Sequence, residues 1–192
     1  MQQLKQTIRQ DILALREQLV PNTRAAYSAA INRRLSSMPE YRQAGTVLGY
    51  MNFGAEFASE LWAAQALADG KQLLLPRVNH HTNRLDLYRV DDLENQLAAG
   101  LWGIREPIAE RCERLERLNE VEFVLLPGVA FARDGARLGY GKGFYDKLLA
   151  RMTHGPALVA AAFAMQIVAQ IPQEETDIKV AWIVTEHETI VC

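Results

Sequence analysis

Residues 122–128 read Glu122-Phe-Val-Leu-Leu-Pro-Gly128, in which a proline and a glycine end the apolar run 123–126. A run of this length between turn signals is typical of a strand that is buried on both faces of a sheet. Pro76 is expected to end a similar strand earlier in the chain. Residues 85–90 alternate between apolar and polar side chains, which predicts an edge or half-exposed strand. Further buried strands are expected at 46–51, 72–75, 157–163 and 181–185.

Helical patterns lie between and before these strands. A second helix is predicted to follow a break at 21–23 and to end at Pro39, and another spans 57–68. Because helices alternate with continuous apolar strands, the sequence predicts an α/β fold in one domain over 1–192. We expect a three-layer sandwich, with a mostly parallel sheet and helices on both faces. The apolar residues of the first helix recur at spacings of three and four, at Leu4, Ile8, Ile12, Leu15 and Leu19.

Composition and charge exclude several classes of protein. The 21 Lys and Arg residues nearly balance the 23 Asp and Glu residues, for a net charge of -2, so we expect no nucleic-acid partner. No apolar segment reaches the roughly 18 residues of a membrane span, and no cluster of Cys and His has zinc spacing. The first residues are polar, and Cys112 and Cys192 are the only cysteines. These features predict a cytoplasmic protein with no membrane contact.

The segments 51–56 and 127–146 each follow a predicted strand. Ligands of open α/β sheets gather outside the carboxyl ends of the strands, so these two segments are the candidate sites. The second contains Gly135-Ala-Arg-Leu-Gly-Tyr-Gly-Lys-Gly-Phe-Tyr-Asp146. Its alternating glycines expose backbone N–H groups, and a predicted helix follows them directly. Arg137 and Lys142 add positive charge, and Asp146 offers a hard oxygen ligand for phosphate-bound Mg²⁺.

This segment is not a common nucleotide motif. The P-loop pattern requires glycine where Ala136 stands and Ser or Thr where Gly143 stands. The dinucleotide pattern fails as well, because the third glycine comes one residue early. A flexible turn with ordinary surface charges is the alternative, and the combination of glycines, cations and a carboxylate disfavours it.

The segment 137–146 nevertheless resembles the 5-formyltetrahydrofolate cyclo-ligase (5,10-methenyltetrahydrofolate synthetase) family, whose pattern Arg-x-Gly-x-Gly-x-Gly-x-Tyr-Asp it matches in full. The flanking segment 126–131, Gln166 with 171–172, and the pair Lys5 and Arg9 extend the resemblance over nearly the whole chain. The resemblance implies a fold like that of sugar-phosphate isomerases and CoA transferases. It also implies the ATP- and Mg²⁺-dependent cyclisation of 5-formyltetrahydrofolate to 5,10-methenyltetrahydrofolate, with release of ADP and phosphate, through phosphorylation of the formyl oxygen. We expect a monomer whose partners are these small molecules.

The resemblance also implies roles for individual residues. Arg137 and Lys142 are expected to stabilise the charge that moves during phosphoryl transfer. Asp146 is expected to bind the metal ion, with help from Asp177. The residues expected to contact ATP are Lys5, Arg9, Arg137, Leu138, Gly139, Tyr140, Gly141, Lys142, Gly143, Phe144 and Tyr145. Without the resemblance, Lys5 and Arg9 are more simply interpreted as a solvated helix face.

The folate pocket is assigned by the resemblance to Met51, Glu56 and Trp102. A carboxylate such as Glu56 can accept two hydrogen bonds from the amino group and ring N–H of a pterin. The alternatives are that Glu56 favours the start of the helix at 57–68 and that Trp102 fills the core. The chain departs from the family pattern at Phe53, Ala55 and Ala58. Two other functions stay open: another phosphate-handling enzyme of this fold, such as a sugar-phosphate isomerase, and a non-catalytic nucleotide-binding module.

Overall fold

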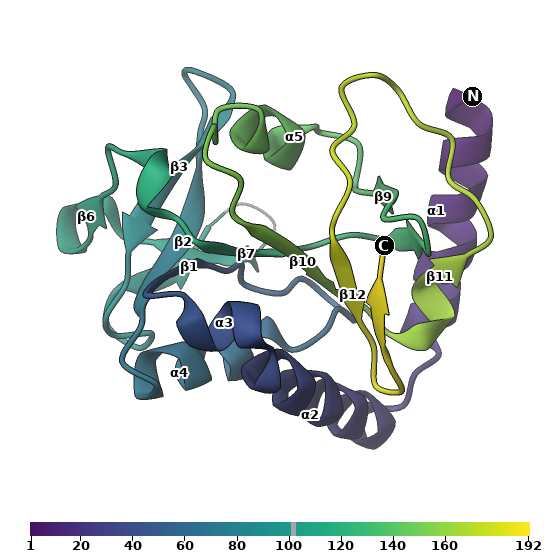
Figure 1. Cartoon of the computed structure of the whole chain (residues 1–192), viewed down its shortest axis with the longest axis horizontal. Helices are drawn as coiled ribbons and strands as arrows, with labels where there is room; N and C mark the ends of the chain where they lie inside the picture. Colours follow the sequence, from purple (N-terminus) through teal and green to yellow (C-terminus); the bar gives the residue numbers. More distant parts are fainter. Residues whose placement is uncertain (101–102) are drawn as a thin grey trace.

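A sheet of eight strands in the order β13-β12-β10-β7-β1-β2-β3-β6 forms the centre of the molecule in a computed structural model, which describes residues 1–100 and 103–192 (Figure 1). The five strands from β12 to β2 run parallel, whereas β13, β3 and β6 pair antiparallel. The predicted mostly parallel sheet is therefore confirmed. Its strands are β1 (Thr46–Leu48), β2 (Gln72–Asn79), β3 (Arg84–Arg89), β6 (Glu113–Arg114), β7 (Phe123–Leu126), β10 (Ala157–Ala161), β12 (Trp182–Val184) and β13 (Thr189–Val191).

Helices cover both faces of this sheet, unevenly. Figure 1 shows α2 (Pro21–Ser37), α3 (Pro39–Gln43) and α4 (Ser59–Ala68) together on one side, whereas the short α5 (Phe144–Leu149) lies on the other. The helix α1 (Gln2–Glu17) stands at one end of the sheet. Pro21 and Pro39 occupy first-turn positions of α2 and α3, where the missing N–H of proline is tolerated.

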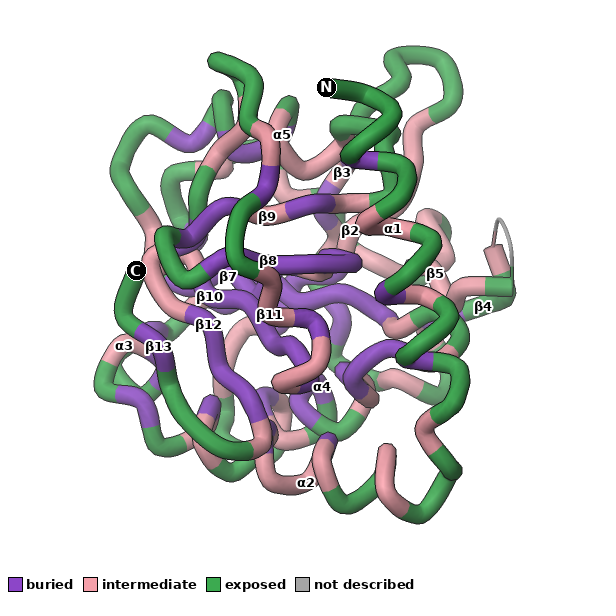
Figure 2. The backbone as a smooth tube through the Cα atoms, turned by 90° about the vertical axis from the view of Figure 1, so that its right-hand side faces the viewer, coloured by how far each residue is buried: buried purple, intermediate pink, exposed green. Residues whose placement is uncertain are grey.

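The strands alternate their side chains between two apolar cores. Phe123 and Leu125 of β7 pack with the α2–α4 side, next to the fully buried Trp62. Val124 and Leu126 pack on the opposite side with Leu148 of α5. Figure 2 shows these central strands as buried. Burial on both faces explains why β7 appears in the sequence as a continuous apolar run.

Two small sheets complete the fold. One contains β11 (Ile167–Val168), β8 (Ala130–Ala132) and β9 (Arg137–Leu138), and the other is the pair β4 (Leu97–Ala99) and β5 (Arg105–Pro107). The β8–β9 hairpin follows β7 and returns Arg137 toward the carboxyl edge of the large sheet. The sequence did not predict these strands, which are too short to show a period of their own. The strands β1 and β12 are also short, but the longer segments 46–51 and 181–185 marked them.

The prediction that Pro76 ends its strand is wrong, because β2 continues through Pro76 to Asn79. The last residue of β1 is Leu48, which lies opposite Leu74, so β2 pairs only with β3 beyond this point. A strand with one neighbour has one free backbone edge, and a proline in such a place loses no ladder hydrogen bond. The half-exposed strand predicted at 85–90 is confirmed by β3, whose residues alternate in burial.

The apolar stripe predicted along the first helix is only partly correct. Ile12 is buried against β8 and β9, but Leu4 and Leu15 are exposed. The buried residues of α1 include the charged Lys5 and Arg16. This helix therefore presents polar side chains toward the interior of the protein. None of the helices in the described part of the chain is long and apolar enough to cross a membrane.

Candidate functional site

A cavity of about 1070 Å³ opens at the carboxyl ends of the central strands. Because β1 and β7 are parallel neighbours, their ends lie at the same edge of the sheet, and the segments that follow both strands line this cavity. All the predicted site residues except Trp102 line it; Trp102 lies outside the described residues. The prediction that two distant segments meet in one place is therefore confirmed as geometry. The binding roles of the individual residues stay predictions.

The glycine loop connects β9 to α5 across this cavity. Gly141 and Gly143 have φ angles of 94° and 65°, in the left-handed region that side chains with a Cβ rarely adopt. Gly143 directly precedes the first residue of α5. Between the two glycines, Lys142 extends an exposed side chain that bonds to no group in the described part of the chain. The loop thus presents a free cation on a backbone shaped by glycine.

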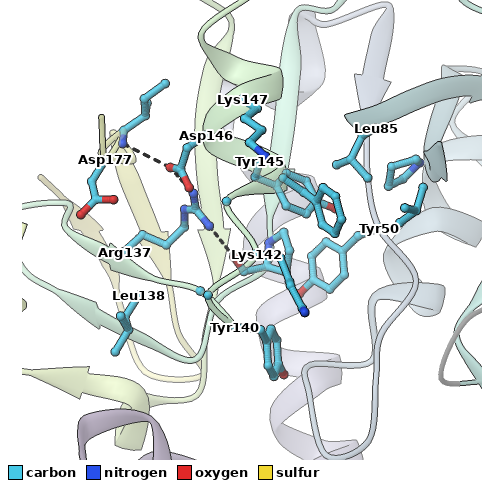
Figure 3. Close-up of a pocket in the computed structure, with 18 of the residues that line it drawn as sticks. Tyr50, Leu85, Arg137, Leu138, Tyr140, Lys142, Tyr145, Asp146, Lys147 and Asp177 are labelled. Carbon is cyan, nitrogen blue, oxygen red and sulfur yellow. Dashed lines mark hydrogen bonds and ion pairs between the residues drawn. The ribbon is translucent and has the colours of Figure 1, made fainter. Parts of the chain in front are cut away.

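Arg137 and Asp146 form an ion pair of 2.7 Å at one end of the cavity, and Figure 3 shows them beside Asp177. The Arg137 side chain is only 4% exposed. Asp146 Oδ1 also accepts a hydrogen bond from the backbone N–H of Ile178. Within the described residues, Asp146 Oδ2 receives no hydrogen bond, and Arg137 Nε has no partner. Asp146, whose side chain is partly exposed, therefore keeps one oxygen for a ligand.

Lys5 of α1 joins the same end of the cavity. Its Nζ lies 2.9 Å from Asp177 and 3.2 Å from Glu174. Burial lowers the pKa of Lys5, but the two carboxylates outweigh this effect and leave the pKa raised. Burial raises the pKa of Asp177. The hydrogen bond from the Glu174 N–H and the charge of Lys5 have the larger combined effect, so the pKa of Asp177 is lowered. Both groups are thus held in their charged forms.

Arg9 lies on the same face of α1 as Lys5, as their spacing predicts. Its Nε donates a 2.7 Å hydrogen bond to the carbonyl oxygen of Gly139. Its guanidinium also lies about 3.6 Å from the position that a Cβ would take at Gly141. Arg9 therefore holds the glycine loop against α1, and the interpretation of Lys5 and Arg9 as a solvated helix face is wrong.

Glu56 is buried at the other end of the cavity, where the Tyr140 hydroxyl donates a 2.6 Å hydrogen bond to its Oε1. The backbone N–H of Phe53 donates to Oε2 at 2.7 Å. Burial raises the pKa of Glu56, and the two hydrogen bonds with the charge of Arg16 oppose only part of the shift. Because α4 begins at Ser59 and Glu60 is the acid of its first turn, Glu56 is not a helix-start acid.

The same end of the cavity is aromatic. Tyr50, Tyr140 and Tyr145 line it together with Leu85, and Figure 3 labels all four. Met51 is buried and lines the cavity beside them. Sequence reasoning missed Tyr50 and Arg16. A seven-residue step from Arg9 reaches Arg16 on the same helix face, which is the one signal that pointed to it.

Within the described residues, no group of three or more His, Cys, Asp or Glu side chains lies close enough to hold a metal ion. Asp146 and Asp177 each retain one carboxylate oxygen without a hydrogen bond from these residues. Mg²⁺ is commonly held by one or two carboxylates, with phosphate and water oxygens completing its shell. The donor set therefore fits a magnesium ion that arrives with a phosphate ligand.

A parallel sheet whose carboxyl edge carries one cavity, lined by a cationic glycine loop and by a buried carboxylate among tyrosines, is typical of an α/β enzyme with a small-molecule site. Residues 1–186 match the 5-formyltetrahydrofolate cyclo-ligase family. The chain belongs to this family, and it is a ligase of folate metabolism. This confirms the resemblance found in the sequence.

Named relatives agree with this assignment. The chain is 29% identical over 184 residues to a mouse 5-formyltetrahydrofolate cyclo-ligase, with 92% of this chain and 90% of that protein covered. The solved structure of Aquifex aeolicus 5,10-methenyltetrahydrofolate synthetase is 34% identical and superposes with a TM-score of 0.85, covering 98% of this chain and 92% of that one. The Mycoplasma pneumoniae 5,10-methenyltetrahydrofolate synthetase shares the fold at 19% identity and a TM-score of 0.75, covering 95% and 98%.

Proposed function

We propose that the protein converts 5-formyltetrahydrofolate to 5,10-methenyltetrahydrofolate while it cleaves ATP to ADP and phosphate. The observation that carries this proposal is the single cavity, which joins the cationic loop at Lys142 to the tyrosine-lined carboxylate of Glu56. Its volume of about 1070 Å³ is at the upper end for ligand sites, as two bound substrates require. The named relatives support the same activity.

The chemistry explains why such a site needs both ends. An N-formyl amide is a poor electrophile, because its nitrogen donates electrons into the carbonyl group. In the proposed reaction the formyl oxygen attacks the γ-phosphorus and ADP leaves. The N10 nitrogen then attacks the activated carbon and loses its proton, and phosphate leaves with the former formyl oxygen. Alignment and charge stabilisation are the main tasks left to the protein.

At the ATP end, the exposed Lys142 and the buried Arg137 supply the positive charge that the moving phosphoryl group needs. Lys5 and Arg9 bring α1 to the same region. The loop residues 138–145 contribute chiefly through backbone N–H groups. Leu138 is buried in the small core beside α1, and the hydroxyl of Tyr140 faces Glu56.

At the folate end, Glu56 keeps free lone pairs after it has accepted its two hydrogen bonds, and a pterin amino group can donate to them. Met51 and Tyr50 supply apolar and aromatic surface for the ring system. We propose that Trp102 takes part as well. Phe53 is exposed at the rim of this end.

We propose that Asp146 and Asp177 hold Mg²⁺ together with the nucleotide phosphates. The ion would neutralise phosphate charge during the transfer. Arg137 and Lys5, which pair with these carboxylates, remain beside the phosphates in this arrangement. We further propose a cytoplasmic location, in keeping with the free thiols of Cys112 and Cys192, and a monomeric state.

Oxygen tracing tests the proposed route. The protein is incubated with MgATP and substrate that carries ¹⁸O in its formyl group, and the released phosphate is analysed by mass spectrometry. We expect the label to appear in inorganic phosphate, because the formyl oxygen forms a bond to phosphorus before it leaves. Label that appears in water or formate, with none in phosphate, would contradict the route. A sugar-phosphate isomerase or a nucleotide-binding module would form no methenyl product at all.

A further inference from the structure

We infer that Arg16 is a positioning residue for the folate end of the cavity: it acts through the Tyr140 hydroxyl to hold the Glu56 carboxylate anionic and correctly oriented. This inference rests on the proposed function, because Glu56 is taken to receive the folate. Arg16 lies in the last turn of α1, far in sequence from both partners. It does not itself line the cavity, whereas Tyr140 and Glu56 do.

The direction of the hydrogen bonds follows from the donor groups. Arg16 Nη2 lies 2.8 Å from Tyr140 Oη, and a guanidinium can only donate. Tyr140 must therefore accept from Arg16, and its single hydroxyl proton is left for Glu56 Oε1 at 2.6 Å. Since the backbone N–H of Phe53 occupies Oε2, both oxygens of Glu56 receive protons from fixed donors. This arrangement suits a carboxylate better than a carboxylic acid, whose own proton would compete with a donor that is already in place.

The charges around Glu56 assign the electrostatic task to Arg16. The groups that face Glu56 are Tyr50, Tyr140 and Tyr145, together with Arg16 on α1. Burial raises the pKa of each of these tyrosines, so the phenols stay neutral. Arg16 Nη1 lies 4.0 Å from Glu56 Oε1, and both side chains are almost completely buried. Arg16 is thus the cation that opposes the cost of burying this carboxylate.

Two other guanidinium nitrogens of Arg16, Nε and Nη1, are buried and have no hydrogen-bond partner among the described residues. A buried guanidinium with two idle donors is expensive unless its charge is needed. Arg9 lies two helical turns before Arg16 in α1 and bonds to the carbonyl oxygen of Gly139. With Arg16 bonded to Tyr140, the helix α1 supports the glycine loop at two points.

The experiment compares Arg16→Met and Arg16→Lys with wild type by calorimetric titration of 5-formyltetrahydrofolate and of ATP across pH. Arg33→Met, an exposed arginine of α2, is the matched control. We expect Arg16→Met to weaken folate binding roughly tenfold to a hundredfold and to leave ATP affinity unchanged. Folate binding requires anionic Glu56, so it is lost as the pH falls through the pKa of Glu56. Removing Arg16 raises that pKa further, and the acid loss of binding should begin at a higher pH.

Two comparisons separate this role from simple structural support. Arg16→Lys keeps the positive charge. In this variant, the pH at which folate binding is lost in acid should return toward the wild-type value. In a Glu56→Gln background, Arg16→Met should have no further effect on the pH profile, because no carboxylate remains to titrate. Equal loss of folate and ATP affinity, or an unchanged acid limb in a folded Arg16→Met protein, would overturn the inference.

If Arg16→Met does not fold, Tyr140→Phe replaces it, since the partly exposed Tyr140 loses only its hydroxyl and the loop backbone is kept. Tyr140→Phe should also bind folate more weakly and bind ATP normally. Unchanged folate binding would overturn the inference that Arg16 acts through the Tyr140 hydroxyl. Wild-type protein that binds no 5-formyltetrahydrofolate would reject the proposed function and this inference together. Normal wild-type binding with unaltered variants would reject the inference alone.

Discussion

The guanidinium of Arg137 and the carboxylate of Asp146 meet at 2.7 Å and thereby join the two ends of the glycine loop (Figure 3). Arg137 belongs to β9, and Asp146 lies in the first turn of α5. The loop is therefore closed by an ion pair of which one member is almost completely buried. A preformed loop of this kind reduces the ordering needed when a phosphate group binds.

Asp146→Asn should raise the Mg²⁺ concentration needed for half-maximal activity more than it changes folate affinity. The substitution removes the proposed metal ligand and weakens the ion pair with Arg137. Mg²⁺ is titrated at saturating ATP, with Asp134→Asn as a control at an exposed carboxylate that pairs with Lys179. An unchanged half-saturation point would count decisively against a metal role for Asp146.

Lys142→Ala should lower kcat by roughly a hundredfold or more, because it removes a cation beside the moving phosphoryl group. The melting temperature should hold, since the side chain is exposed and bonds to none of the described residues. Steady-state kinetics and a melting curve measure both effects, with Lys179→Ala as the control at another exposed lysine. A near-normal kcat would show that Lys142 does not stabilise charge during phosphoryl transfer.

Glu56→Gln should weaken folate binding by roughly tenfold to a hundredfold, the cost of losing a charge-assisted hydrogen bond. ATP binding should change little, because Glu56 bonds to Tyr140 and to the backbone of Phe53 rather than to Lys142 or Arg137. The variant should also be less stable by about 1–3 kcal/mol, because buried Arg16 loses its counter-charge. Calorimetry with both ligands and a denaturation curve test this. Equal loss of both affinities would indicate that the whole site is disturbed.

Asp177→Asn should destabilise the protein at neutral pH by about 1 kcal/mol, and the effect should disappear in acid. The pKa of Asp177 is lowered in the folded state, so its contribution is present above the ordinary value of 3.8 and is lost as the pH falls through the lowered pKa. Urea unfolding at neutral pH and well below pH 3.8 measures the difference. Glu94→Gln, an exposed acid in a turn, is the control. A pH-independent difference would show that the ion pair with Lys5 is not its source.

The sequence predicted the features that depend on local pattern. Continuous apolar runs such as 123–126 marked the parallel strands, and the glycine spacing marked the loop. The meeting of Glu56 with this loop followed from the rule that parallel strands end at one edge. These predictions needed only the pattern of apolar residues, the positions of glycine and proline, and the direction of parallel strands.

Features set by tertiary context were missed. The burial of Arg16, and the exposure of Leu15 one residue before it, depend on which face of α1 meets the glycine loop. Tyr140 was expected among the ATP contacts, but the direction of its hydroxyl toward Glu56 depends on a contact across 84 residues. The passage of β2 through Pro76 depends on where β1 ends. The resemblance to sugar-phosphate isomerases and CoA transferases stays a prediction.

The most direct test of the proposed activity mixes the purified protein with MgATP and 5-formyltetrahydrofolate, and follows the absorbance of the methenyl product together with ADP release. We predict that product and ADP form in equal amounts and that neither forms when the other substrate is omitted. Lys142→Ala should suppress both signals together. Methenyl formation without ATP, or ADP release without methenyl product, would contradict the account.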